Sequence, residues 1–409
     1  MRILIQKFGG TSVANPEGRI QVATKVSEVV SKGYSPVVVV SAIGRMGDPY
    51  ATDTFIKMVS NIYSEVPKRE LDLLMSCGEI ISGSVMVSTL QSLGLEAILL
   101  TGGQAGIITN DSFGEARIIR VEQEKILQHL KEGKVVVVTG FQGITEDGEI
   151  TTLGRGGSDT TAAALGVALG AEAIDLYTDV QGIMTADPRI VEDAKIMEVV
   201  SYNDICNLAY EGAKIIHPRA VEIAMQKNIP LRVKCTFTDG PGTLVTNNLP
   251  DMAEGSDLIG DRIITGIAHT PNVTQIKINI QDEEDKPQTV KRIFKGLALA
   301  NISVDFISVQ LEKVLFTVRD ELANRAVNIL KNMGFEPETI PNCAKVALVG
   351  GGIADVPGVM ADLVEALADA GIEILQSADS HTTIWVLVKK EQMATAVQAL
   401  HRKLELGKQ

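Results

Sequence analysis

A glycine-rich stretch at residues 151–163, TTLGRGGSDTTAA, constrains the fold of this chain more than any other part of its sequence. A run with strong β propensity, residues 134–141 (KVVVVTGF), precedes it, and a run of small residues at 160–170, with the composition of a helix, follows it. Glycines let the backbone turn tightly and approach a ligand, and the stretch contains Gly154, Gly156 and Gly157. The pattern therefore predicts a strand, a tight turn and a helix in succession.

The predicted turn suits an anionic ligand. We expect Ser158 or Asp159 to cap the helix that begins at the run TTAAA, residues 160–164. The unpaired N–H groups and the positive dipole end of such a helix attract anions. Arg155 adds a fork of donors that matches a carboxylate or a phosphate. An ordinary glycine turn with a cap fits this stretch equally well, so the remaining sequence has to decide.

The composition indicates which kinds of partner the protein binds and in which cellular compartment it occurs. A length of 409 residues predicts two or three domains, and a net charge of −13 argues against nucleic acid or an anionic membrane as the main partner. The four cysteines are scattered, without a CxxC pair or a cysteine–histidine cluster, which predicts reduced thiols and no metal site. The N-terminus lacks a signal-peptide pattern, and we expect no apolar run near the roughly 20 residues that span a bilayer. These features predict a cytoplasmic protein.

A second loop of the chain also favours phosphate. A short apolar strand at residues 3–6 ends at KFGGTS, residues 7–12, and a helical pattern follows at 17–32. The loop is neither a Walker A sequence nor GxGxxG, which disfavours a dinucleotide site. Lys7 precedes the glycines, where its ammonium group can neutralise phosphate charge.

Strands and helices alternate through the first 245 residues. The run PVVVVSA at 36–42 reads as a buried parallel strand, and further strands are expected at 97–100 and 173–178. This alternation predicts a mostly parallel sheet with helices on both faces. On the helical run 71–81, Glu79 has two interpretations: a solvated helix face, or a buried carboxylate that waits for a cation such as a substrate ammonium.

Three loops with phosphate-binding chemistry fall at predicted strand ends: residues 7–12, 154–159 and 178–189. Because the carboxyl ends of parallel strands share one edge of a sheet, these loops together predict a nucleotide site. His217 has no metal-ligating neighbour at useful spacing, so we expect a structural role for it.

The last 150 residues contain an internal repeat. A polar linker at 247–261 precedes it, and apolar positions then recur with a period of 70. Leu297 recurs as Leu367, for example, and Ile302 as Ile372. Each repeat reads strand, helix, strand, strand, helix, a small α+β module. Since such modules expose sheet edges, we expect the two to pack together and to join a second chain.

The motifs together resemble aspartate kinase of the amino-acid kinase family over essentially the whole chain. The residues that carry the resemblance are KFGGTS at 7–12, GRGGSDTTA at 154–162, YTDVQGIMTADPR at 177–189, GAKIIHPRA at 212–220 and PGT at 241–243. The paired repeats are similar to the tandem ACT regulatory modules of that family. The resemblance implies an α/β amino-acid kinase domain at 1–246, a linker at 247–262, and two ferredoxin-like ACT modules at 263–340 and 341–409.

The family implies transfer of the ATP γ-phosphoryl group to the β-carboxylate of L-aspartate, the first step towards lysine or diaminopimelate, threonine and methionine. By resemblance, Lys7, Gly9 and Gly10 hold the transferring phosphoryl group, Arg155 binds the aspartate α-carboxylate, and Ser158 and Asp159 belong to the junction of substrate and phosphate. The catalytic set is Lys7, Arg155 and Asp159. The substrate set adds Ser41, Glu79 and Ser158. The resemblance assigns to ATP the residues Lys7, Phe8, Gly9, Gly10, Thr178, Asp179, Met184, Thr185, Ala186, Asp187, Pro188, Arg189 and Lys214.

A carboxylate is already a nucleophile, so charge neutralisation and alignment suffice for the chemistry, with Mg²⁺ held mainly by ATP oxygens and water. The resemblance also implies feedback by lysine, threonine or diaminopimelate, which the sequence does not separate. The effector set is Asn301, Ile302, Val356, Pro357, Gly358, Val359, Gln376 and Ser377. The resemblance also implies assembly of chains through the ACT modules. Some family members make a separate small ACT subunit from an internal translation start, and Met252 is a candidate for such a start in this sequence.

The sequence departs from the family at one turn and leaves other functions open. The first repeat has DEEDKPQ at 282–288 where members show a DxPG-type turn, whereas the second keeps Val356–Val359 (VPGV), so we place more weight on the second repeat's ligand turn. A kinase acting on glutamate shares the fold, and a non-enzymatic amino-acid sensor with a decayed kinase domain is a third possibility. A dehydrogenase is disfavoured by the missing dinucleotide fingerprint.

Overall fold

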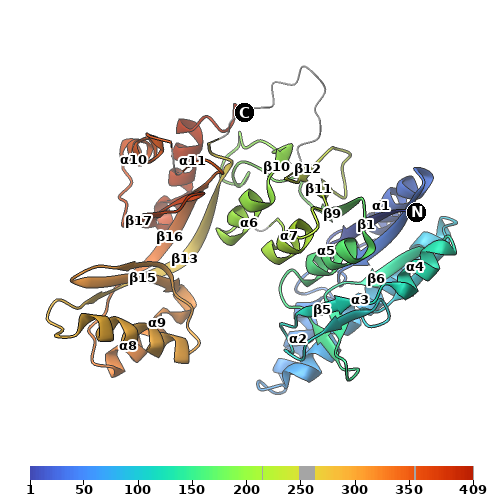
Figure 1. The fold of residues 1–409 in the computed structure, drawn as a ribbon, viewed down its shortest axis with the longest axis horizontal. Coiled ribbons are helices and arrows are strands. Elements are labelled where there is room, and N and C mark those ends of the chain that lie inside the picture. The colour runs from blue at the N-terminus through green and yellow to red at the C-terminus, as the bar shows by residue number, and fades with distance from the viewer. Residues whose placement is uncertain (214, 248–262, 354–355, 409) are drawn as a thin grey trace. The chain divides into compact units, whose positions relative to one another are not determined.

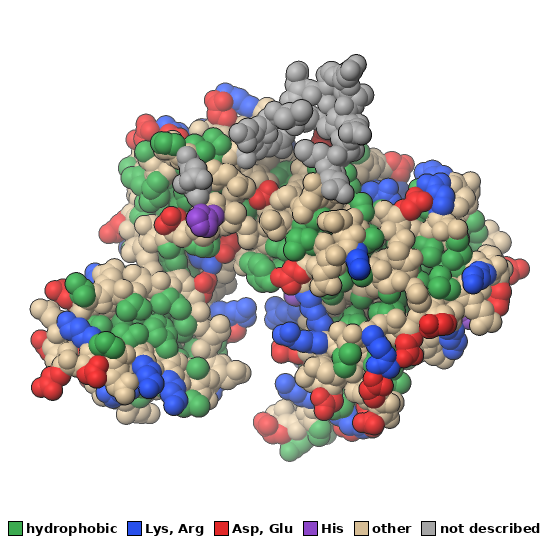
Figure 2. Space-filling view, viewed as in Figure 1, with side chains coloured by type: hydrophobic (Ala, Val, Ile, Leu, Met, Phe, Trp, Pro, Cys, Tyr) green, Lys and Arg blue, Asp and Glu red, His purple; other side chains and the backbone are tan. Residues whose placement is uncertain are grey.

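The structure is a computed structural model that describes residues 1–213, 215–247, 263–353 and 356–408. The described chain forms two compact units. The N-terminal unit comprises residues 1–184, 196–209 and 215–247, and the C-terminal unit comprises 185–195, 210–213 and 263–408 without the undescribed pair. Figure 2 shows acidic and basic side chains both spread over the visible face of each unit.

The N-terminal unit is built on an eight-stranded sheet (Figure 1). Its strands in spatial order are β10 (Val199–Val200), β12 (Thr243–Val245), β11 (Leu231–Cys235), β9 (Ala173–Thr178), β1 (Arg2–Phe8), β2 (Tyr34–Val40), β6 (Val135–Thr139) and β3 (Ala97–Leu100). All neighbouring strands from β11 to β3 are parallel to one another. Strand β12 runs antiparallel to β11, and β10 pairs parallel with β12. The predicted mostly parallel sheet is confirmed.

Helices cover both faces of this sheet. The helices described for this unit are α1 (Pro16–Ser31), α2 (Thr52–Ser60), α3 (Lys68–Ser92), α4 (Glu124–Lys131), α5 (Gly157–Leu169), α6 (Tyr202–Tyr210) and α7 (Pro218–Met225), of which α2 packs on α3 and α7 on α5. Helices α1 and α3 pack against the face that carries Phe8, through Val22 and Met86 among others. Helix α5 packs on the opposite face, where Gly166 lies against Ile5 and Ile174. Side chains alternate along a strand, so one strand serves both layers.

Helix α3 departs from the expectation that no segment approaches membrane-spanning length. Among the described residues it is the one helix long and apolar enough, by length and composition alone, to cross a membrane. It packs against α1, β3, β6 and β8 (Ile150–Thr152), and its buried positions include two carboxylates, Asp72 and Glu79. We therefore interpret α3 as a core helix whose small and apolar residues fit it between other elements.

A small four-stranded sheet contains the last two strands before the glycine turn. Its strands in order are β5 (Ile118–Val121), β4 (Ile107–Thr109), β7 (Gln142–Ile144) and β8. The β7–β8 hairpin is antiparallel and interrupts the direct path from strand to glycine turn that the sequence predicts. It is β8 that leads into Gly154, so this small sheet positions the turn.

The C-terminal unit contains one six-stranded antiparallel sheet (Figure 1). Its strands in order are β14 (Asp305–Val309), β15 (Lys313–Arg319), β13 (Gly266–Asn279), β16 (Glu338–Val349), β18 (Thr383–Lys389) and β17 (Gln376–Asp379). Its helices are α8 (Lys286–Leu299), α9 (Asp320–Asn332), α10 (Val359–Asp369) and α11 (Met393–Lys403), with a 3-10 turn η1 (Lys390–Gln392). Strands β15 and β18 begin 70 residues apart, which confirms the repeat.

The two repeats are joined by their long central strands. Strands β13 and β16 pair antiparallel along most of their lengths, so each strand contributes to both halves of the sheet. Each repeat has its own apolar core, centred on Phe316 in the first and on Leu363 in the second. Ile264 and Ile267, which precede or begin β13, pack into the core of the second repeat. A third buried cluster joins Val273 and Phe306 of the first repeat to Cys343 and Leu387 of the second. The repeats therefore share backbone pairing and this cluster, in addition to a core of their own.

Candidate active site

Lys7 and Asp159 meet on one face of the large sheet. Lys7 is the sixth residue of β1 and Asp159 lies in the first turn of α5. The Lys7 Nζ atom lies 2.7 Å from Asp159 Oδ1, and the two side chains are only 15% and 14% exposed. Because both groups are screened from water, this ion pair is stronger than a surface pair, and a competing phosphate can recruit the same ammonium.

The start of α5 differs from the prediction. The helix begins at Gly157, its N-cap is Gly156 with φ of 66°, and no side chain caps it. The predicted cap by Ser158 or Asp159 is therefore wrong, as is a start at the TTAAA run. A left-handed glycine turn places both residues inside the first helical turn, so Ser158 turns to Ser41 and Asp159 to Lys7.

Close packing explains the glycines on either side of this turn. A Cβ atom on Gly156 would lie 2.2 Å from Cβ of His217, and one on Gly157 would lie 2.6 Å from the Phe141 ring. His217 itself is the N-cap of α7, where Nδ1 accepts from the Arg219 N–H at 3.4 Å. Burial lowers the pKa of His217. The predicted structural role of this histidine is confirmed.

The loop after β1 brings backbone close to backbone. A Cβ atom on Gly10 would lie 2.6 Å from the Ala42 carbonyl oxygen and 2.7 Å from that of Gly44. The Gly44 N–H donates to the Gly10 carbonyl at 3.1 Å. The Phe8 ring is fully buried and stacks on Tyr177 with ring centres 4.6 Å apart. Phe8 can therefore offer a nucleotide only its backbone.

Glu79 is buried beside the loop that follows β2. Its side chain is 2% exposed, and its Oε1 atom accepts from the Ala42 N–H at 3.1 Å. Its Oε2 atom has no hydrogen-bond partner among the described residues. Burial raises the pKa of Glu79 to about 8. The solvated-face interpretation of Glu79 is wrong; a buried carboxylate with one free oxygen suits an incoming cation.

The neighbouring serines and arginine complete a polar group around the two glycine loops. The Ser41 hydroxyl donates to Ser158 Oγ at 3.0 Å, which joins the end of β2 to the start of α5. Arg155 is exposed at the tip of the glycine turn and has no hydrogen-bond or ion-pair partner among the described residues. Its guanidinium is thus available to a ligand carboxylate or phosphate.

At the end of β9, Thr178 and Asp179 are less enclosed. The Thr178 hydroxyl donates to Asp179 Oδ1 at 3.2 Å, and Asp179 Oδ2 lies 2.7 Å from a guanidinium nitrogen of Arg45. Both partners of this ion pair are substantially exposed, so the pair is weak and can open for a ligand.

Two further residues, neither of which has a predicted role, hold the glycine turn in place. Asp72, fully buried on α3, accepts from the N–H groups of Gly114 and Thr152 at 2.9 and 2.8 Å and from the Thr152 hydroxyl at 2.7 Å. Arg219 donates to the carbonyls of Leu153 and Ala116, both at 3.0 Å. Both therefore fix the strand that leads into Gly154. Arg219 belongs to the stretch GAKIIHPRA at 212–220, but nothing in the sequence predicts that it contacts Leu153 and Ala116.

Comparison with known proteins identifies the family. The model of the amino acid kinase family matches residues 2–235, and that of an ACT domain matches residues 338–402. Aspartokinase 1 of Bacillus subtilis (strain 168) is 52% identical over 408 residues, with 100% of both chains covered. The chain belongs to the aspartokinase family.

Further relatives agree over the same length. The aspartokinase of Geobacillus stearothermophilus is 40% identical over 415 residues, covering 100% of this chain and 98% of that one. Escherichia coli aspartokinase III in complex with aspartate and ADP, in its R-state, has a TM-score of 0.77 at 26% identity, covering 99% of this chain and 100% of that one. The structure of the same enzyme with lysine and aspartate, in its T-state, gives a TM-score of 0.73.

The nucleotide set implied by the aspartokinase family is divided between the two units. Met184 belongs to the N-terminal unit, whereas Thr185–Arg189 belong to the C-terminal unit. There Ala186 packs into the core of the second repeat, and the Thr185 hydroxyl is hydrogen-bonded to His401 Nε2 at 3.0 Å. Arg189 pairs with Asp187 at 2.7 Å and lowers the pKa of that carboxyl. Lys214 lies outside the described residues.

The chain before Lys214 is also held in the C-terminal unit. Glu211 Oε2 lies 2.9 Å from Lys345 Nζ, whose other partner is Asp305 at 2.7 Å. Gly212, with φ of 118°, lies so close to His269 that a Cβ atom would be 2.1 Å from its carbonyl oxygen. Sequence assigned to the kinase domain is thus anchored in the aspartokinase C-terminal unit at two places.

The residues of the effector set occupy different environments. Asn301 is exposed with φ of 55°, Gly358 has φ of 104° at the start of α10, and Ser377 is exposed on β17. The side chains of Ile302 and Val359 are buried in the two cores, and Val356 packs partly against the second. Pro357 is exposed. Gln376 accepts from Gln275 Nε2 at 2.8 Å and donates to the Phe306 carbonyl at 2.7 Å.

Proposed function

We propose that this aspartokinase transfers the γ-phosphoryl group of ATP to the β-carboxylate of L-aspartate, giving 4-phospho-L-aspartate and ADP. The observation that carries the proposal is the Lys7–Asp159 pair of 2.7 Å between two glycine loops, with the buried Glu79 nearby in the same unit. The proposal places this reaction first in the synthesis of lysine or diaminopimelate, threonine and methionine.

The side chains divide between the two ends of the substrate. A β-carboxylate oxygen attacks the γ-phosphorus as the bond to ADP breaks, so no proton has to be removed from the nucleophile. Lys7 leaves Asp159 to neutralise the transferring group beside Gly9 and Gly10. Arg155 binds the α-carboxylate and Glu79 the α-ammonium, while the Ser41–Ser158 hydrogen bond holds the loops that carry them.

The nucleotide would be bound by the ends of β9 and the segments that follow. The proposed nucleotide residues there are Thr178, Asp179, Met184, Thr185–Arg189 and Lys214. Mg²⁺ bound with ATP supplies charge neutralisation on the phosphates. Carboxylate oxygens such as those of Asp159 and Asp179 are the donor type that Mg²⁺ prefers, and the metal keeps much of its water.

Regulation is proposed to act through the ACT modules, at 263–340 and 341–409, with the kinase domain at 1–246. Lysine, threonine or diaminopimelate would bind at the effector set and shift the population of two arrangements. The anchoring of Thr185–Lys195 in the C-terminal unit supports this coupling, because a change in that unit also acts on a nucleotide segment. Met252, the proposed internal start, lies outside the described residues.

A cytoplasmic homo-oligomer, joined through the ACT modules or with a separate small ACT subunit, completes the proposal. Neither nucleic acid nor a membrane is a proposed partner.

The decisive experiment compares acceptors. Purified protein with Mg-ATP should form ADP in the presence of L-aspartate, and hydroxylamine should trap the acyl phosphate. Lys7→Ala should lower kcat by orders of magnitude while amino-acid binding to the C-terminal unit persists. Phosphorylation of glutamate alone would reject the aspartate assignment, and effector binding without any ADP formation would favour a sensor.

A further inference from the structure

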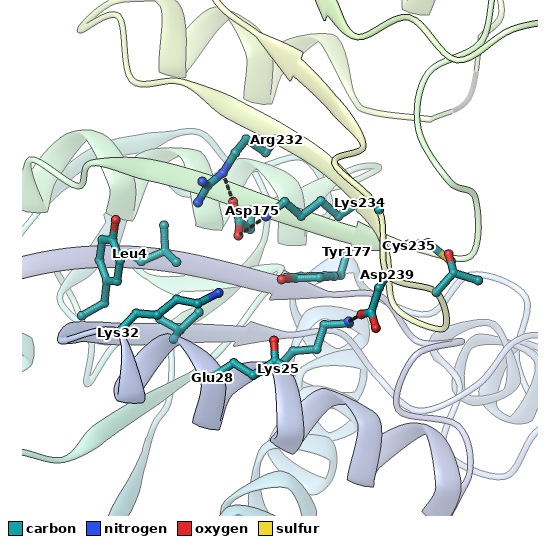
Figure 3. A pocket seen from close by; sticks show the side chains of 14 residues that line it. Leu4, Lys25, Glu28, Lys32, Asp175, Tyr177, Arg232, Lys234, Cys235 and Asp239 are labelled. Atoms are coloured by element: carbon teal, nitrogen blue, oxygen red, sulfur yellow. Dashed lines mark hydrogen bonds and ion pairs between the residues drawn. The ribbon is translucent and has the colours of Figure 1, made fainter.

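A cavity of about 280 Å³ opens in the N-terminal unit (Figure 3). Strands β1, β9 and β11 supply one wall, α1 supplies another, and the turn at 238–240 forms part of the rim. Its volume has room for roughly nine water molecules, or for a metabolite smaller than a drug-sized ligand.

The cavity lies on the opposite face of the sheet from the Lys7–Asp159 pair. Leu4 lines the cavity, and alternation along β1 places Leu4 and Phe8 on the α1 side of the strand and Lys7 on the α5 side. Aspartate and ATP bound beside Lys7, as proposed above, would therefore lie on the other face of the sheet and would not occupy this cavity.

Cations dominate the lining. The lining has four basic side chains, Lys25, Lys32, Arg232 and Lys234, and three carboxylates, those of Glu28, Asp175 and Asp239, so its net charge is +1 (4 − 3). The chain as a whole has 13 more acidic than basic residues. Such a local excess of cations in an acidic protein is the charge pattern of an anion site.

The carboxylates of the lining do not satisfy these cations. Asp175, 2% exposed, is shared between Arg232 and Lys234, whose nitrogens lie 2.5 and 3.2 Å from its two oxygens. Lys25 pairs with Asp239 at 2.7 Å, but that carboxylate is 96% exposed. Figure 3 shows these contacts as dashed lines, and Lys32 has no ion-pair partner among the described residues.

The surroundings of Lys234 disfavour its charged form. Burial lowers the pKa of this ammonium, and Arg232 and Lys32 lower it further, while Asp175 raises it. Asp175 therefore offsets the burial of this ammonium and the nearby cations only in part, and an additional anion in the cavity would stabilise the charged form further.

We propose that this cavity is a second ligand site, which binds the carboxylate or phosphate group of a small metabolite between Lys25, Lys32 and Lys234. The anion completes the charge balance that Asp175 leaves open, and Leu4 and the Tyr177 ring contact the remaining part of the ligand. The ammonium groups of these lysines would donate charge-assisted hydrogen bonds to either kind of anionic group.

Two contacts join residues at the cavity to the end of β1 and the glycine loop that follows it, residues 7–12. Tyr177 lines the cavity and stacks on Phe8, which directly precedes Gly9. Thr236, which follows the lining residue Cys235, is hydrogen-bonded through its hydroxyl to Ser12 Oγ at 2.7 Å. A ligand in the cavity thus contacts residues that support the loop from behind.

Binding can be tested without any assumption about the reaction. Inorganic phosphate and succinate are titrated calorimetrically into the full-length protein at constant ionic strength. The double substitution Lys25→Gln/Lys32→Gln should weaken binding of the preferred anion at least ~10-fold, since each lost charged contact is worth more than 1 kcal/mol. Lys125→Gln, on exposed α4, is the matched control and should bind like the native protein.

Two further variants make the outcome decisive. Lys7→Ala should retain the binding, because phosphate held by the active-site loop would be lost with it, and Thr238→Trp, at the exposed rim, should block the cavity without removing a charge. Preference for phosphate or for succinate identifies the ligand's anionic group. The proposal is overturned if neither anion binds with a Kd below about 10 mM, or if the double variant and Thr238→Trp bind as tightly as the native protein.

Discussion

Replacement of Glu79 by glutamine should abolish the pH dependence of aspartate binding. The native carboxyl is 2% exposed, accepts one hydrogen bond from the Ala42 N–H, and has a pKa raised to about 8 by burial. In the free protein at neutral pH it is therefore mostly protonated, whereas an ammonium group of aspartate pairs with the ionised form. Binding of aspartate must then release a proton from Glu79.

The size of the effect follows from the ionised fraction. With a pKa of about 8, Glu79 is roughly 1% ionised at pH 6 and about half ionised at pH 8, so aspartate affinity should rise about 50-fold between these values. Stability should change in the opposite direction. The unfolded chain releases this proton near pH 4.5 and the folded chain only near pH 8, so stability falls across that window, by at most about 5 kcal/mol.

Calorimetric titration of aspartate from pH 6 to pH 8, with urea unfolding at the same values, measures both effects. Glu79→Gln should bind aspartate weakly at every pH and should lose less stability than the native protein as pH rises. Glu124→Gln, on the exposed surface of α4, should behave like the native protein. A native affinity that stays flat between pH 6 and pH 8 would refute the ionisation of Glu79 on binding.

Three other perturbations test the supports of the site. Arg219→Ala removes two hydrogen bonds of 3.0 Å to the strand before Gly154, so KM for aspartate should rise about 10-fold with a smaller change in kcat; an unchanged KM in steady-state kinetics would contradict this positioning role. Gly156→Ala places a Cβ atom 2.2 Å from His217 and should cost more than about 2 kcal/mol in urea unfolding, whereas Gly170→Ala, with φ of 60° and open space around it, should cost only about 1 kcal/mol; equal costs would rule out the clash. Removal of residues 263–409 exposes Ala186 and should raise KM for ATP, and a truncated enzyme with native KM would show that its packing is irrelevant.

Much of the site could be predicted from local sequence. The strands at 97–100 and 173–178 lie where the alternation of strand and helix patterns places them, because β-branched runs between turns report buried strands. The loops that carry Lys7 and Asp159 were recognisable from glycine and charge alone, and the structure brings the two side chains to 2.7 Å. Ser41 and Ser158, assigned to the substrate by the family resemblance, are hydrogen-bonded to each other.

Other features depend on residues far apart in the chain. The cap of α5 was wrongly predicted because Ser158 and Asp159 have better partners at Ser41 and Lys7, over 110 residues away. A prediction from local propensity considers only the residues of the helix's first turn. It therefore misses partners such as Ser41 and Lys7, which are distant in the chain. The burial of Glu79 and the placement of Thr185 in the C-terminal unit have the same origin.

The sequence by itself determined the parallel sheet, the glycine loops and the repeat of 70 residues, since these follow from backbone propensity and the period of apolar side chains. Only the tertiary structure decided which carboxylate is buried, which cations share Asp175, and which kinase-domain segments pack with the second repeat. Burial and charge compensation depend on every element that surrounds a group, and that surrounding exists only once distant segments have packed together.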